Sequence, residues 1–124
     1  MDHSSENFRT AAALEENLKK ALTELLVLTL LRQREYYIGE LTEQLQAQSG
    51  GTLSIVFPYG VIYRMTQAQY ITESQKRRAP DGRLRQYYKI TETGQIYLAQ
   101  LLDVYERFIA GVSNILSVGE NKNG

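Results

Sequence analysis

Leucines recur every three or four positions over Thr10–Arg34, a stretch that holds neither glycine nor proline. This spacing predicts one long amphipathic helix. Within Leu25–Leu31 the apolar residues extend nearly all the way round the helix, so we expect this part to be fully buried. A second, shorter helix is expected over Tyr36–Ala47, with three apolar residues on one face, namely Ile38, Leu41 and Leu45.

The period changes after a third helix, which we expect over Pro58–Gln69 because proline is favoured in a first helical turn. Two short runs, Ile71–Lys76 and Leu84–Ile90, then flank the turn signal Pro80-Asp81-Gly82 and predict a two-stranded hairpin. Strand side chains alternate between two faces. The second run should therefore direct Leu84, Tyr88 and Ile90 toward the core and place on its outer face Arg83, Arg85, Tyr87 and Lys89.

A second long helix is predicted over Gln95–Leu116, which carries a broad apolar stripe. Three helices followed by a hairpin is the order of a winged helix-turn-helix. We therefore expect a mainly α fold with a small β wing and long helices at both ends. Its segments would be a mobile tail at 1–9, a winged helix-turn-helix DNA-binding domain at 10–93, a dimerisation helix at 94–117 and a disordered tail at 118–124.

Charge is distributed unevenly along a chain whose formal net charge is zero. The segment Arg64–Lys89 has seven basic and two acidic residues, a net charge of +5, which leaves −5 on the rest of the chain. Such a concentration of one sign indicates a polyanionic partner. Because the basic hairpin follows a short helix, double-stranded DNA is the first candidate.

Composition argues against an enzyme. The single histidine, His3, lies in the N-terminal tail and the chain has no cysteine, so a rigidly held general base and a thiolate site both lack their residues. Gly50-Gly51 lacks the lysine of a phosphate-binding loop, and we expect no metal and no cofactor. No apolar run approaches the ~18 residues that span a membrane. We therefore expect a cytoplasmic protein without a membrane partner.

Five segments resemble, in order, the PadR-type transcriptional regulators, a winged-helix family. They are LTELLVLTLL at 22–31, YIGEL at 37–41, FPYGVIYRMTQAQYI at 57–71, DGRLRQYYKITETG at 81–94 and the last helix. Two residues depart from the family pattern, since Gln69 replaces a turn glycine and Thr66 replaces a glutamate. Gln69 would then need a left-handed backbone or a shifted turn.

The candidate DNA contacts lie on the third helix and the hairpin. The major groove admits one helix, from which arginine, glutamine and tyrosine can reach bases. Cations of the hairpin suit phosphates, where they fix the register of binding and make affinity depend on salt. The candidate DNA-binding residues are Ser54, Tyr59, Tyr63, Arg64, Gln67, Lys76, Arg77, Arg78, Arg83, Arg85 and Lys89.

Each assignment has a plainer alternative. The hairpin cations could serve only to solvate the surface, Tyr63 could pack in the core, and Ser54 could merely turn the chain. Arg64 could pair with an acidic neighbour such as Glu40. The basic hairpin could also bind an acidic protein, which would make the chain a winged-helix protein–protein adaptor.

The apolar stripe of the last helix is wider than the core of so small a domain requires. We expect a homodimer in which this helix packs against the N-terminal helix of a second copy, with an intramolecular helical hairpin with the first helix as the alternative. The expected interface residues are Leu14, Leu18, Ile96, Leu101, Tyr105, Phe108, Ile109, Val112 and Leu116.

The predicted function is that of a transcriptional regulator, a repressor that binds a palindromic operator as a homodimer. PadR-like proteins include members that respond to phenolic or drug-like compounds, so the resemblance also implies that a small aromatic effector could release the DNA. Its candidate lining residues are Tyr36, Tyr37, Tyr97, Tyr105 and Phe108.

Overall fold

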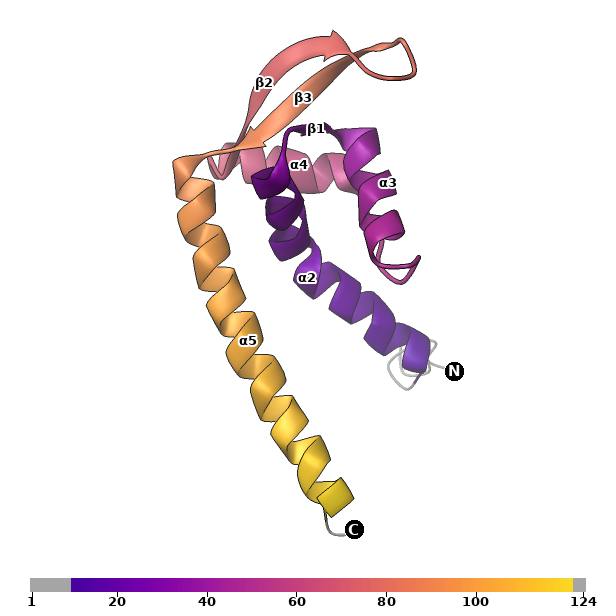
Figure 1. The fold of residues 1–124 in the computed structure, drawn as a ribbon, viewed down its shortest axis with the longest axis vertical. Helices are drawn as coiled ribbons and strands as arrows, with labels where there is room; N and C mark the ends of the chain where they lie inside the picture. The colour runs from indigo at the N-terminus through magenta and orange to yellow at the C-terminus, as the bar shows by residue number, and fades with distance from the viewer. Residues whose placement is uncertain (1–9, 122–124) are drawn as a thin grey trace, which may run out of the picture.

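The computed structural model describes residues 10–121 and follows the expected order of elements (Figure 1). Helix α2 begins after Thr10, whose hydroxyl accepts the backbone N–H of Ala13 and so caps the helix. The predicted tail at 1–9 lies outside the described residues, as do residues 122–124 of the tail predicted at 118–124. Residues 118–121 instead continue the last helix. The main elements are α2 (Ala11–Gln33), α3 (Ile38–Gln48), α4 (Pro58–Gln67), β2 (Ile71–Arg78), β3 (Leu84–Ile90) and α5 (Glu92–Asn121).

The sheet has a third strand that the sequence pattern did not predict. Strand β1 (Tyr36–Tyr37) pairs antiparallel with β3, so the sheet order is β1-β3-β2. The second helix was expected to begin at Tyr36, but it begins two residues later. Tyrosine suits a pleated, half-buried surface, and the pairing of Tyr36 with Tyr88 and of Tyr37 with Tyr87 provides that surface.

The core lies where α2, α3, α4 and the base of the sheet meet. Leu28, Leu41, Met65, Ile71 and Leu98 have almost no exposed surface, and they come from five different elements. The expected burial of Leu25–Leu31 holds for its C-terminal part, while Leu25 and Leu26 are half-buried at the edge of the core. The winged helix-turn-helix architecture is therefore confirmed.

Two side chains of β3 differ in burial from the expectation. Tyr87, expected outside, is 4% exposed because Tyr37 packs edge-on against its ring and Arg77 covers it at 3.7 Å from the ring centroid. Leu84, expected in the core, is 62% exposed because the hairpin projects beyond the helical core on one side (Figure 1). Tyr88 and Ile90 pack against the core as predicted.

Helix α5 extends away from the hairpin on the other side of the molecule (Figure 1). Its first turns contribute buried Leu98 and half-buried Leu101 and Leu102 to the core. The remaining turns keep the same stripe apolar but uncovered, with Phe108 and Leu116 more than 60% exposed. Across residues 10–121, no helix is both long and apolar enough to cross a membrane.

Candidate nucleic-acid interface

Helix α4 presents a polar and aromatic face to solvent. Its Val61, Ile62 and Met65 pack inward, which leaves Tyr59 and Tyr63 outside at 75% and 68% exposure. Exposed Gln67 lies one turn after Tyr63 on this outer face. The alternative that Tyr63 packs in the core is therefore wrong.

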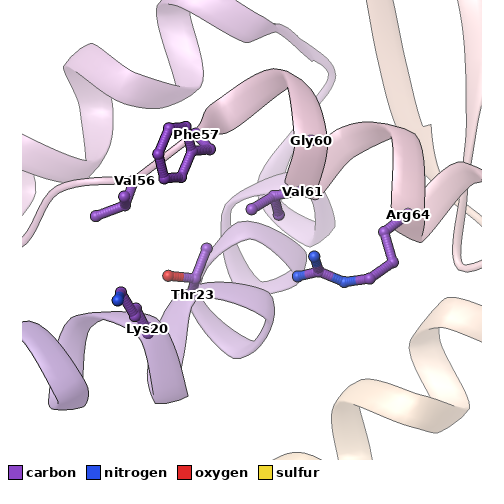
Figure 2. Close-up of a pocket in the computed structure, with 7 residues that line it drawn as sticks. All are labelled: Lys20, Thr23, Val56, Phe57, Gly60, Val61 and Arg64. Atoms are coloured by element: carbon purple, nitrogen blue, oxygen red, sulfur yellow. The ribbon is translucent and has the colours of Figure 1, made fainter.

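Arg64 is turned sideways, toward α2, rather than straight outward (Figure 2). Its Nε donates to Glu24 Oε2 at 3.2 Å. Arg64 therefore forms an ion pair, as the alternative reading of this residue expected. Its partner is Glu24 rather than Glu40. Glu40 pairs with Arg34 at 3.3 Å, because α3 places it beside the end of α2.

Arg64 also borders a shallow trough between α2 and the N-terminal half of α4 (Figure 2). The backbone enters α4 through Phe57, whose φ of +54° is left-handed. That conformation is strained for a residue with a side chain, and it leaves the Phe57 ring 79% exposed at the rim of the trough. The lining residues are Lys20, Thr23, Val56, Phe57, Gly60, Val61 and Arg64.

Three of the wing cations are held by partners within the fold. Arg77 lies over the Tyr87 ring and donates to Glu35 at 3.3 Å, and Arg78 donates to the Gly82 carbonyl at 2.8 Å. The carboxylate of Glu35 also accepts the Ser74 hydroxyl, and these donors lower the pKa of Glu35. These partners fix where the side chains point.

Arg85 is held in the same way at the tip of the hairpin. It donates to Asp81 at 2.9 Å and stands 5.1 Å from the centroid of the Tyr37 ring. The hydrogen bond from Arg85 is the main reason that the pKa of Asp81 is lowered. Asp81 therefore stays ionised, and its charge offsets part of the positive charge of the wing.

The other three wing cations are exposed. In the part of the chain that the structure describes, the side chains of Lys76, Arg83 and Lys89 have neither a hydrogen bond nor an ion pair. The backbone of Arg83 is nevertheless fixed, because its N–H donates to Asp81 at 3.0 Å and its carbonyl accepts from Ala79. Arg83 thus extends from a rigid turn with its guanidinium group in solvent.

The structure disperses the residues proposed for an effector. Tyr36 lies under Arg34 at 3.9 Å, Tyr37 against Tyr87, and Tyr97 against Tyr70 at 4.0 Å between ring centroids. The other two, Tyr105 and Phe108, lie exposed farther along α5. Ser54 is half-buried in the loop before α4.

The sequence pattern missed the acidic partners that orient the cations, namely Glu24, Glu35 and Asp81. Only Asp81 had a local signal, because a turn aspartate commonly accepts a backbone N–H two residues later. Glu24 and Glu35 meet partners about 40 positions away in the sequence, and no local pattern indicates such pairs.

Comparison with known proteins gives one family. The model of the transcriptional regulator PadR-like family matches residues 27–100, which is more than half of the chain. No curated protein is a significant match.

Solved structures share the fold at low sequence identity. A PadR family regulator from Eggerthella lenta aligns with a TM-score of 0.71 at 20% identity, covering 93% of this chain and 97% of that one. A PadR-like regulator from Bacillus cereus aligns at 0.69 and 24%, covering 81% and 96%. A transcriptional regulator from Clostridium thermocellum aligns at 0.70 and 19%, covering 79% and 93%. With its winged helix-turn-helix and the family match over its centre, this chain belongs to the PadR-like family of DNA-binding transcriptional regulators.

Proposed function

We propose that the chain is a homodimeric repressor that binds a two-fold symmetric operator through α4 and the wing. The observation that carries this proposal is the outer face of α4, where Tyr59, Tyr63 and Gln67 are exposed and followed by a wing with unpaired cations. Tyrosine and glutamine can donate and accept hydrogen bonds at base edges. Arg83, Lys76 and Lys89 would contact phosphates and supply affinity that does not depend on sequence.

The dimer is supported by the uncovered stripe of α5. Tyr105, Phe108, Ile109, Val112 and Leu116 are all at least 38% exposed, in continuity with the turns that pack on the core. A continuous apolar face of this extent is uncommon on a monomer. A second copy offers the same face, and isologous pairing would cover both. At the N-terminal end, Leu14 and Leu18 of α2 are likewise 62% and 50% exposed.

Two-fold symmetry of the protein implies two half-sites about one helical turn of DNA apart. A protein bound across such a site excludes other proteins from the same stretch of DNA, which is why we favour a repressor. Arg77, Arg78 and Arg85 act within this proposal mainly by holding the wing in shape, since each already has a partner in the fold.

The test is selection of DNA fragments bound by the purified protein, followed by fluorescence anisotropy with the selected duplex. We expect binding that resists an excess of unrelated duplex and weakens steeply with salt. Repeating the selection with aromatic compounds tests for an effector. Absence of DNA binding at low salt would overturn the proposal and favour the adaptor function.

A further inference from the structure

One carboxylate joins three helices. Glu24 of α2 accepts the Arg64 Nε–H at Oε2, at 3.2 Å, and the Tyr97 hydroxyl at Oε1, at 3.0 Å. Arg64 belongs to α4 and Tyr97 to the start of α5. The side chain of Glu24 is only 27% exposed, so its two contacts are partly shielded from water.

The ring of Tyr97 is also packed against Tyr70. Its ring stacks on Tyr70, with 4.0 Å between centroids and 12° between planes, and Tyr70 follows directly after α4. Burial, and then the hydrogen bond to Glu24, raise the pKa of Tyr97, so its hydroxyl remains a donor at neutral pH. The end of α4 and the start of α5 therefore meet through two contacts of different kinds.

The backbone closes the same joint. The N–H of Thr91 donates to the Tyr70 carbonyl at 3.0 Å, and its hydroxyl donates to the Gln69 carbonyl at 2.6 Å. Gly94 passes so close that an added Cβ would lie 2.0 Å from the Tyr70 oxygen. These contacts hold the chain at one point of the joint, around Tyr70 and Thr91, and Glu24 adds a second link on the α2 side.

We infer that Glu24 is a positioning residue which, by binding Arg64 and Tyr97 together, sets the angle between the recognition helix α4 and the helix α5. In the homodimer proposed above, on which this consequence depends, that angle determines how far apart the two recognition helices lie. Arg64 then orients α4 and does not read bases.

Because α5 is long, a small change in this angle moves its far end by a large distance. The helix has 30 residues, or about 45 Å at 1.5 Å per residue. A tilt of about 5° at the joint would move the far end by roughly 4 Å, close to the ~3.4 Å rise of one base pair. Loss of the link should therefore relax the preference for one spacing between half-sites.

The experiment compares Glu24→Ala and Tyr97→Phe with the parent, and uses Glu15→Ala as the control because it removes a carboxylate from an exposed position on the same helix. Affinity is measured for one half-site, for the selected operator, and for operators lengthened or shortened by one base pair. We expect half-site affinity within about twofold of the parent and operator affinity lowered by roughly three- to tenfold, with weaker discrimination between spacings. Combined with Glu24→Ala, Tyr97→Phe should lower operator affinity little further, because both residues act through the Glu24 carboxylate.

A second readout needs no DNA. The chain lacks cysteine, so spin labels can be placed through Gln67→Cys on α4 and Gln100→Cys on α5, with labelled chains diluted in unlabelled protein. We expect a narrow distance distribution in the parent and in the Glu15→Ala control, and a broader one in the Glu24→Ala and Tyr97→Phe variants. Unchanged distance distributions in both variants would overturn the inference. If the parent binds no DNA, the proposed function fails while these distances still decide the role of Glu24.

Discussion

At the scale of residues, the arginines of the wing differ in whether the fold gives their side chains a partner. Arg77 and Arg85 lie against aromatic rings and carboxylates, whereas Arg83 has only its backbone fixed. The sequence alone predicts an equally available positive charge at every arginine and lysine of the hairpin. Which charges face solvent depends on Glu35 and Asp81, and therefore on the folded hairpin.

Replacement of Arg83 by alanine should weaken binding to all duplexes by a similar factor. It should also reduce the slope of log affinity against log salt concentration by about one, because one phosphate contact is lost. The reason is that, within residues 10–121, its guanidinium group makes no hydrogen bond or ion pair that the substitution would break. Anisotropy titrations at several salt concentrations measure both effects. Arg107→Ala, which removes an exposed cation of α5, should leave the slope unchanged. An unchanged slope for Arg83→Ala would remove this residue from the DNA interface.

Gln69 shows a second effect at the residue scale. It has a φ of +66° after α4, where the N–H groups of Gln69 and Tyr70 bond back to Thr66 and Met65. Gly50 occupies the equivalent position after α3 with a φ of +64°. The left-handed alternative raised for Gln69 is therefore confirmed, and this position favours glycine.

We expect Gln69→Gly to raise the free energy of unfolding by about 0.5–1 kcal/mol, because glycine relieves the left-handed strain more than it loosens the unfolded chain. Thermal unfolding followed by circular dichroism measures the change. Ala68→Gly, one residue earlier at a φ of −77°, should instead destabilise the protein. A lower melting temperature for Gln69→Gly would show that the side chain matters more than the backbone.

At the scale of elements, the joint between the sheet and α5 decides where the last helix points. The hydroxyl of Thr91 caps the helix by accepting the N–H of Gly94, and α5 starts at Glu92, three residues before the predicted Gln95. Gly94, directly before the predicted helix, lies in the first helical turn and is buried. Its role is close approach to the backbone at Tyr70, which only the folded chain reveals.

Gly94→Ala should lower the free energy of unfolding by about 2–3 kcal/mol, since the new Cβ would overlap a backbone oxygen that cannot move freely. Gly111→Ala is the matched control on the same helix, because an added Cβ there meets no atom within 4 Å. Alanine at 111 should stabilise the helix by up to about 1 kcal/mol. Equal melting temperatures for the two variants would contradict the close contact at Gly94.

At the scale of the whole molecule, the fold leaves the apolar stripe of α5 without a cover. The stripe that begins with buried Leu98 continues along α5 to Ile115 and Leu116, which are 76% and 66% exposed. Folding of a single chain therefore covers the apolar stripe only in the first turns of α5. Leu101, one of the expected interface residues, packs half-buried against the core of its own chain.

Phe108→Glu should convert the proposed homodimer to a monomer while the winged helix remains folded, because residue 108 lies outside the core. Light scattering after size exclusion measures the mass, and circular dichroism measures the helix content. Asn114→Glu, which adds the same charge on the polar face of α5, should remain a dimer. A dimeric Phe108→Glu protein with parental affinity for the operator would place the interface elsewhere.

From the sequence alone follow the order of elements, the helix-turn-helix with its wing, and the concentration of positive charge after α4. These features depend on periodicity and turn residues, which act between near neighbours in the chain. Tyr59, Tyr63 and Gln67 could be identified as outward residues because helical spacing assigns Val61 and Met65 to the core.

Only the tertiary structure decided the third strand, the burial of Tyr87, the exposure of Leu84 and the partner of Arg64. Each depends on residues distant in sequence, as Tyr37 is from Tyr87 and Glu24 from Arg64. Local periodicity assigns a side chain to a face of its own element, but the neighbouring element determines whether that face is covered and which charge it meets.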